Sequence, residues 1–316
     1  MLLSRYHRSL LSPAEAEVYD LAEKTIHRRA HSMVVDGGCS NEHILKALYA
    51  LEFDDPETQI NLYDREFTIF REGGSKKVFP HYCASTKEED EKRRRLEDAI
   101  DKIVEGAKKF KTEYEMELYA HDSILDGLTY HHEDSLDSET YSAYGALVNK
   151  KAVCKGISYA LMMVLSRLDI WCAVIPGKKE FNHAWNIVRI DGRYYNVDAT
   201  YDLQDWKTTH VYFNVDDRHF LPDHPCNIGP ICDSDEHGWF TVNGRKARST
   251  EELFRQIVNG LSDRPRFFAV AYDNIPYGDL EWIIEEALRY SEAYTYGWAI
   301  YKERQALELE DLKDRK

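Results

Sequence analysis

The sequence predicts an α+β protein in which a helix that begins at a cysteine packs on an antiparallel sheet, behind a helical N-terminal extension. Two observations support this fold class. Residues 154–168 repeat apolar side chains at helical spacing, with Cys154 in the first turn. Two extended segments follow, and the second is joined to a third by Asp191-Gly192, a dipeptide typical of two-residue β-hairpin turns.

Composition and charge exclude several classes of protein. The chain has 316 residues, 43% of them hydrophobic, which is enough to bury a sizeable core. No apolar run approaches the roughly 20 residues that cross a bilayer, and the first residues do not resemble a signal peptide, so we expect a cytoplasmic protein. A net charge of −15 repels phosphate backbones and anionic lipids. Neither nucleic acid nor a membrane is therefore an expected partner.

The six cysteines are scattered too widely for a disulfide framework, so we expect reduced thiols. They are Cys39, Cys83, Cys154, Cys172, Cys226 and Cys232. Four residues that could bind a metal also lie close together in the sequence: His224, Cys226, Cys232 and His237. Their spacing matches no common zinc arrangement. We therefore expect neither a metal nor another cofactor.

Cys154 has the setting of a nucleophile. A side chain in the first turn of a helix faces unpaired backbone N–H groups and the positive end of the helix dipole, and both favour thiolate over thiol. The same N–H groups can stabilise the oxyanion that forms on an attacked carbonyl group. Because a solitary cysteine near a helix start is more often a small core residue, this interpretation depends on its partners.

The hairpin supplies those partners through its register. A two-residue loop at Asp191-Gly192 pairs Ile190 with Arg193, and the same register makes Trp185 the partner of Asp198. His183 shares a strand face with Trp185, so it lies diagonal to Asp198 at about 7–8 Å between backbones. A hydrogen bond between the two side chains can bridge that distance.

We therefore predict a triad of Cys154 as nucleophile, His183 as base and Asp198 as the acid that orients the imidazole. Asp198 could instead cap a turn, since it precedes Ala-Thr. Asn182 is a candidate for the cleft wall, and Trp185 is expected to pack beside the site. Tyr144 is a candidate for the oxyanion hole, although an aromatic residue in this segment is more often part of a core.

Three blocks of sequence support the triad by their order: residues 152–156 around the cysteine, 182–186 around the histidine and 195–201 around the aspartate. Together they resemble the transglutaminase-like superfamily, particularly its bacterial members, whose catalytic Cys, His and Asp match Cys154, His183 and Asp198. The likeness covers roughly residues 115–225. Such relatives are often exported, whereas this chain shows no export signal.

The resemblance implies a papain-like fold and acyl transfer through a thioester, with a protein or peptide as substrate. The amide that is attacked would belong to a peptide bond or a glutamine side chain. Water as acceptor would make a protease or deamidase, whereas a lysine amine would make a cross-linking enzyme. The alternative is a binding or scaffolding module that has kept this fold without turnover.

We expect three parts along the chain. Residues 1–112 form a mainly helical extension, residues 113–245 the transglutaminase-like catalytic core, and residues 246–316 an α/β segment packed on that core. Helix starts are predicted at Ser12, with a capping box to Glu15, and at Ser249, with one to Glu252. The last part is expected to continue with a strand, a helix and an extended run, at residues 266–272, 280–288 and 294–301.

Overall fold

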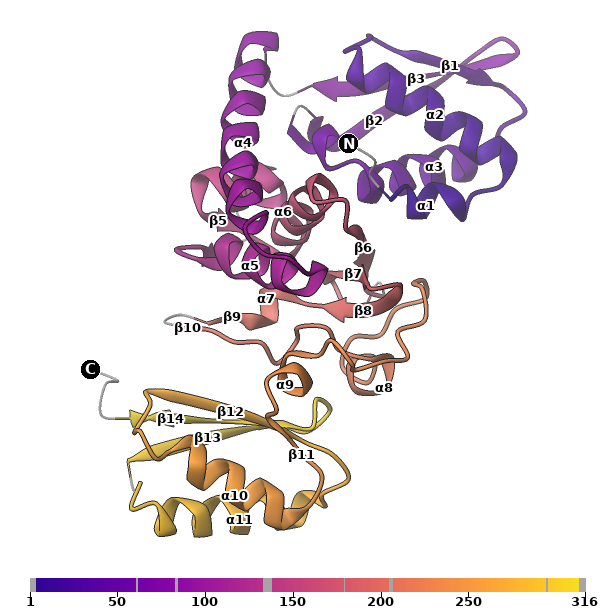
Figure 1. Ribbon diagram of the computed structural model, residues 1–316. Helices are drawn as coiled ribbons and strands as arrows, with labels where there is room; N and C mark the ends of the chain where they lie inside the picture. Colours follow the sequence, from indigo (N-terminus) through magenta and orange to yellow (C-terminus); the bar gives the residue numbers. More distant parts are fainter. Residues whose placement is uncertain are drawn as a thin grey trace.

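Three groups of elements follow one another along the chain in the computed structural model, which describes residues 4–60, 62–82, 85–132, 138–178, 180–204, 207–293 and 295–312 (Figure 1). Helices and mainly antiparallel sheets alternate, so the chain has an α+β fold, as predicted. Cys83 and position 294 of the predicted extended run lie outside the described residues.

The N-terminal group packs helices on a small sheet. The helices are α1 (Tyr6–Ser9), α2 (Pro13–His27) and α3 (Asn41–Asp54), and the antiparallel strands, in the order β1-β3-β2, are β1 (Met33–Asp36), β2 (Leu62–Glu72) and β3 (Ser75–Tyr82). The capping box from Ser12 to Glu15 is present in both directions. The extension therefore contains a complete sheet as well as helices, and its predicted boundary at residue 112 stays a prediction.

The central group is built around one buried helix, α6 (Cys154–Arg167), in which every residue from 156 to 166 is buried. On one side it contacts α4 (Thr86–Ala107) and α5 (Glu113–Leu125), and on the other β6 (Trp171–Pro176) and β7 (Ala184–Ile190). Because both sides are covered, α6 is apolar around its circumference and not only along the predicted stripe.

The sheet beside α6 has the predicted hairpin. Its strand order is β6-β7-β8, with β8 at Arg193–Val197, and Ile190 pairs with Arg193 across Asp191-Gly192. Both turn residues have positive φ, of 48° and 84°, as this turn type requires. The ladder continues to Asn186 opposite Val197, so the next residues, Trp185 and Asp198, leave the ladder together.

Short elements connect these layers and carry several residues of the site. They are η1 (Pro56–Ile60), β4 (Thr129–Tyr130), η2 (Ser138–Tyr141), the π-helix η3 (Gly145–Asn149), β5 (Lys151–Ala152), α7 (Ala199–Asp202), β9 (Leu203–Gln204), β10 (Lys207–Thr208), α8 (Asp217–Phe220) and α9 (Trp239–Val242).

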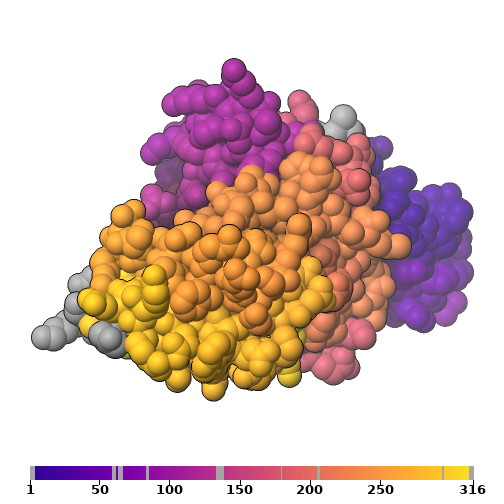
Figure 2. All heavy atoms as spheres, turned by 60° about the horizontal axis from the view of Figure 1, so that its bottom comes forward, coloured from indigo at the N-terminus to yellow at the C-terminus, as the bar shows by residue number. Residues whose placement is uncertain are grey.

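The C-terminal unit, residues 246–312, is a sheet covered by helices on one face. The sheet has the order β11-β12-β14-β13, and the elements are β11 (Lys246–Ala247), α10 (Thr250–Gly260), β12 (Phe267–Tyr272), α11 (Tyr277–Tyr290), β13 (Tyr296–Tyr301) and β14 (Ala306–Asp311). Ser249 accepts a hydrogen bond from the N–H of Glu252, as predicted. Figure 2 shows this unit, in orange and yellow, at the surface of the molecule.

The two faces of β12 explain how this unit joins the centre. Phe268 and Val270 pack with the apolar side chains of α10 and α11. Ala269 and Ala271 point the other way and pack in one cluster with Trp185 of the central sheet. Small side chains on this face allow a close approach of the two sheets, so the unit is docked on the core.

The core also buries an acid, Glu117 of α5, which is fully inaccessible to solvent. Burial raises the pKa of Glu117 to about 8, although Asn214 donates a hydrogen bond of 2.8 Å to its Oε2. An unfolded glutamate has a pKa near 4.5. The folded state therefore keeps a proton that the unfolded state loses, and the stability this gives is lost as the pH rises from about 4.5 through 8.

We predict that Glu117→Gln removes this dependence on pH. Relative to the variant, the wild type should lose on the order of a few kcal/mol of unfolding free energy between pH 5.5 and pH 8.5. Urea unfolding at the two pH values measures the difference. Glu105→Gln, at an exposed position of α4, is the matched control and should follow the wild type. Parallel behaviour of Glu117→Gln and wild type would contradict the assignment.

Candidate active site

Cys154 is the first residue of α6 and lies in the wall of a cleft. Val153 precedes it in extended conformation and gives the helix no side-chain cap. The helix start is held from outside, because the N–H of Val153 donates to the carbonyl oxygen of Thr140 at 3.0 Å. Cys154 itself stays partly exposed, which a nucleophile needs.

Gly156 of the cysteine block is explained by this packing. A Cβ atom at Gly156 would lie 2.6 Å from the carbonyl oxygen of Thr140 and 2.8 Å from that of Ser142. Both obstacles are backbone atoms, which cannot rotate away. The absence of a side chain therefore allows residues 140–142 to support the first turn of α6.

His183 lies directly before β7, on the other wall of the cleft. Its N–H donates to the carbonyl oxygen of Phe181 at 2.6 Å, and its carbonyl oxygen accepts from the N–H of Gly177 at 2.9 Å. Two further bonds tie β7 to α6: Ser158 donates to the carbonyl oxygen of Ala184 at 3.2 Å, and Asn186 donates to that of Ser158 at 3.0 Å. The helix of the cysteine and the strand of the histidine are thus fixed to each other.

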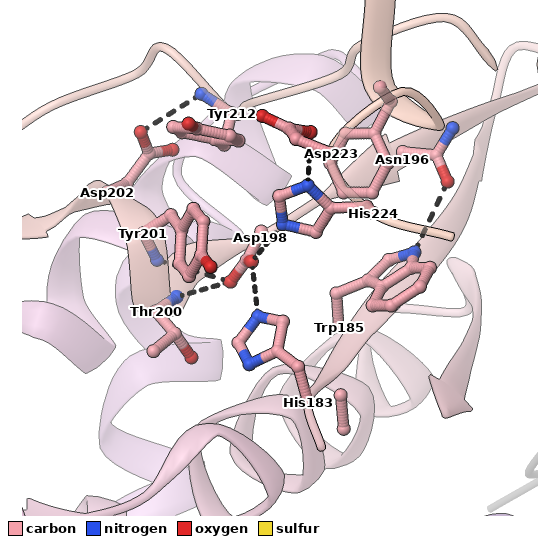
Figure 3. A network of polar contacts seen from close by, with 12 residues as sticks. His183, Trp185, Asn196, Asp198, Thr200, Tyr201, Asp202, Tyr212, Asp223 and His224 are labelled. Carbon is pink, nitrogen blue, oxygen red and sulfur yellow. Dashed lines mark hydrogen bonds and ion pairs between the residues drawn. The ribbon is translucent and has the colours of Figure 1, made fainter. Parts of the chain in front are cut away.

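Asp198 follows β8 and is 1% exposed. Its Oδ2 accepts a hydrogen bond of 2.6 Å from Nε2 of His183, which is the pairing that the hairpin register predicts (Figure 3). Its Oδ1 accepts bonds from the N–H groups of Thr200, at 2.9 Å, and Tyr201, at 3.2 Å. Asp198 therefore both holds the imidazole and caps α7, so the two interpretations from the sequence hold together.

The pKa of His183 responds to both of its neighbours, Asp198 and Cys154. Burial lowers the pKa of His183, but the charge of Asp198 and hydrogen bonds with Asp198 and Cys154 outweigh burial and raise it to about 10. Nε2 is occupied by Asp198, which leaves Nδ1 to face the thiol. Burial raises the pKa of Asp198, yet the charge of His183 and its hydrogen bonds bring it well below its usual range. At neutral pH the pair is an imidazolium and a carboxylate.

Two cavities meet at His183. The first, of about 830 Å³, is lined by Cys154 and by Tyr141, Lys155 and Lys178. The second, of about 840 Å³, is lined by Thr200 and by three tyrosines, Tyr201, Tyr212 and Tyr301. The residues common to both are Tyr130, His132, Phe181, Asn182 and His183. Asn182 thus lines both cavities.

Tyr144 is not at the cleft, contrary to the candidate role in the oxyanion hole. It is 4% exposed and packs in the central core, with Lys92 and Arg95 of α4 within 6 Å of its ring centroid, at 5.9 and 5.5 Å. Trp185 is fully buried, stacks on His183 with ring centroids 6.2 Å apart, and donates to Asn196 at 3.3 Å. It supports the imidazole from behind.

Tyr130, and not Tyr144, lines the cavity that contains Cys154. Strand β4 pairs in parallel with β5, which sets Tyr130 opposite Ala152, two residues before the cysteine. Burial and the nearby Cys154 raise the pKa of Tyr130 to about 12, and the backbone of Cys154 acts in the opposite direction through a hydrogen bond. The Tyr130 side chain therefore lies beside the first residue of α6. No local motif signals this contact, because it arises from pairing between distant segments.

The structure also adds His224 to the site, since its Nε2 lies 2.9 Å from Oδ2 of Asp198. Two groups of described residues could hold a metal ion by proximity: His183, Asp198 and His224, and separately His121, Asp122 and His210. The segment from His224 to His237 does not converge, because His237 contacts Tyr195 and Asp191 instead. The five described cysteines are free thiols.

Comparison with known proteins gives the family of this segment. Residues 100–199 match the family model described as the transglutaminase-like superfamily. The matched range contains Cys154, His183 and Asp198 at the three positions described above. Residues 100–199 of this chain form a transglutaminase-like segment. No protein with curated function matches it.

Three solved structures are similar to this transglutaminase-like chain. One is a TGase, with 17% identity and a TM-score of 0.33 over 47% of each chain. The second is a proposed cysteine protease from Cytophaga hutchinsonii, with 14% identity and a TM-score of 0.28 over 43% of this chain and 61% of that one. The third is a proposed protease from Parabacteroides distasonis, with 15% identity and a TM-score of 0.26 over 43% of this chain and 36% of that one. This chain thus spans less than two thirds of each of them. Among its described helices, none is long and apolar enough to cross a membrane.

We predict that Gly156→Ala slows alkylation of Cys154 by iodoacetamide, because the new methyl group displaces the first turn of α6. Overpacking of this kind costs about 1–3 kcal/mol of stability. Mass spectrometry of the alkylated protein and thermal unfolding measure the two effects. Gly278→Ala in α11 is the control, since a Cβ atom there meets nothing within 4 Å. Wild-type reactivity in Gly156→Ala would show that the close approach does not matter for the thiol.

Proposed function

We propose that this protein is a thiol acyltransferase or hydrolase that attacks peptide or glutamine amides and forms a thioester on Cys154. One observation carries the proposal: His183 bonds Asp198 at 2.6 Å, and its pKa is raised to about 10 because the contributions of Asp198 and Cys154 outweigh burial. An imidazolium beside a cysteine at neutral pH stabilises the thiolate, which is the arrangement of an activated cysteine nucleophile.

The first half-reaction follows from these positions. Because His183 already carries its proton, Cys154 reacts as the thiolate of a thiolate–imidazolium pair, and this thiolate attacks the carbonyl carbon of the amide. The imidazolium then donates that proton to the leaving nitrogen, which departs as ammonia from glutamine or as an amine from a peptide. The product is a thioester on Cys154 and a neutral imidazole that still donates Nε2–H to Asp198.

In the second half-reaction the acceptor loses its proton to His183 and attacks the thioester. Water releases a carboxylic acid, and a lysine amine forms a new amide; in both cases His183 returns the proton to the departing thiolate. The second cavity reaches His183 without including Cys154 in its wall, so it offers the acceptor an approach separate from that of the acyl donor. The tyrosines there suit an acceptor with an apolar or cationic side chain.

Tyr130 is the proposed side-chain donor of the oxyanion hole. Tyr130 lines the same cavity as Cys154 and pairs with Ala152, two residues before it, and an attacked carbonyl oxygen must approach the N–H of Cys154 from that cavity. When negative charge develops on this oxygen, the hydroxyl and the N–H can both donate to it. Tyr141 lines the same cavity and is 40% exposed.

We predict that Cys154 reacts with iodoacetamide at pH 7 much faster than Cys39 or Cys172, and that His183→Ala removes this difference. The physical reason is that the imidazolium stabilises the thiolate. Peptide mapping by mass spectrometry measures each thiol separately. A Cys154 no faster than Cys39 would favour the alternative of a binding module that has lost turnover.

The dependence on pH gives a second readout of the same pair. Because the pKa of His183 is raised to about 10, its proton remains bound throughout the neutral range and is lost as the pH rises through about 10. Acyl transfer needs that proton on the leaving nitrogen. The rate should therefore hold across neutral pH and fall above about 10, whereas a fall near pH 6.5 on the alkaline side would contradict the assignment.

For Tyr130→Phe we expect a split between two reactions. Alkylation by iodoacetamide forms no oxyanion and should keep its rate, whereas acylation of Cys154 by a peptide ester should slow by about 100-fold, the usual effect of removing one oxyanion donor. Stopped-flow and mass spectrometry measure both rates on the same protein. Tyr141→Phe is the matched control and should leave both unchanged. Equal loss of both reactions would indicate a displaced cysteine instead.

A further inference from the structure

Asp198 has a second histidine that the proposed reaction does not use. Nε2 of His224 lies 2.9 Å from Oδ2 of Asp198, the same oxygen that accepts from His183 at 2.6 Å (Figure 3). His224 is fully buried and packs against the rings of Phe220 and Tyr201, at centroid distances of 4.2 and 4.8 Å. It makes no contact with Cys154 that would give it a direct part in the chemistry.

The other nitrogen of His224 determines what it can offer Asp198. Nδ1 lies 2.6 Å from Oδ1 of Asp223 and 3.2 Å from the guanidinium of Arg304. If Arg304 donates to Nδ1, the ring is neutral and carries its proton on Nε2. If Nδ1–H donates to Asp223, Nε2 must also carry a proton to bond a carboxylate. In either case Nε2–H donates to Asp198.

Arg304 belongs to the C-terminal unit, in the turn between β13 and β14, and is 5% exposed. Its guanidinium pairs with Asp223, donates to the carbonyl oxygen of Phe220 at 2.8 Å, and lies over the rings of Tyr212 and Phe220 at 4.7 and 4.6 Å. A charge buried this completely is held in one place by its partners.

The chain of contacts therefore runs from the C-terminal unit to the thiol: Arg304, then Asp223 and His224, then Asp198, then His183 and Cys154. Asp198 depends on it for one of its four hydrogen bonds, because the other three come from His183 and from the backbone of α7. Without His224, Oδ2 would accept a hydrogen bond from His183 alone, and the carboxylate could move together with the imidazole.

We propose that His224 is a positioning residue that fixes Asp198 behind His183, and that Arg304 holds His224 in place. Through Arg304, the C-terminal unit contributes to the geometry of the active site. This inference rests on the proposed function, since it assigns the way in which the triad is oriented. Both residues act through Asp198 and do not touch substrate.

The test compares His224→Phe with His224→Gln. Phenylalanine keeps the aromatic packing but removes the donor, whereas the amide nitrogen of glutamine can donate from nearly the same point as Nε2. We expect His224→Phe to lower kcat of acyl transfer by about 10-fold to 100-fold with little change in KM, and His224→Gln to recover most of it. A structural role alone predicts that glutamine is no better than phenylalanine, and that result would overturn the proposal.

Arg304→Lys tests the link to the C-terminal unit, because lysine keeps the charge but cannot bond Asp223 and the carbonyl of Phe220 in the same geometry. We expect it to change kcat in the direction of His224→Phe. Lys302→Gln, at an exposed position of the same turn, is the control and should match the wild type. If Arg304→Lys keeps the wild-type kcat, the C-terminal unit does not contribute to the active site.

A measurement without substrate separates this proposal from the proposed function. The ¹⁵N NMR signals of the His183 ring report its bond to Asp198 whether or not the protein turns over a substrate. We expect them to shift in His224→Phe and to return in His224→Gln. If wild-type protein shows no acyl transfer that depends on Cys154, the proposed function fails while these signals still decide the role of His224. Stoichiometric zinc in the purified protein, lost in His224→Phe, would overturn it in favour of a metal site.

Discussion

The buried carboxylate of Asp198 is the constraint on which the rest of the site depends. A carboxylate taken out of water costs several kcal/mol unless donors replace its hydration. Here the donors come from separate parts of the chain: the backbone of α7, His183 before β7, and His224 after α8. Each donor is needed to bury the charge, so the hydrogen bonds that stabilise the fold at this point also orient the base.

Helix α6 places a second demand on the same region. Its middle must be apolar on all sides, because helices cover one side and the sheet covers the other. Its first turn must remain open to solvent and free of a side-chain cap, so that the backbone N–H groups and the thiol of Cys154 stay available. Residues 140–142 meet the second demand, because they support the helix start at Val153 and Gly156 through backbone atoms.

The candidate site divides into a part that sequence reasoning could reach and a part that it could not. Cys154, His183 and Asp198 each lie within a local pattern, and the Asp191-Gly192 turn fixes the register that joins the last two. Tyr144, the candidate for the oxyanion hole, lies in the central core. Its spacing in the sequence fits a helix face but does not show which side of the helix is buried. Tyr130 reaches the cysteine only through the parallel pairing of β4 with β5, which no short pattern announces. The first part was expected to be mainly helical, but it also contains a three-stranded sheet in the order β1-β3-β2.

By itself, the sequence predicted that Cys154, His183 and Asp198 belong to one site, because capping, hairpin register and residue order act over a few neighbouring residues. Only the tertiary structure decided which residues hold Asp198 in place, namely His224 and, through it, Arg304. His224 is 26 residues from Asp198 in the chain, and Arg304 is another 80 from His224. Contacts over such separations depend on how whole layers dock, and here on the alanine face of β12 that brings the C-terminal sheet against the centre. Local patterns carry no record of that docking, since it is set by the summed packing of many side chains.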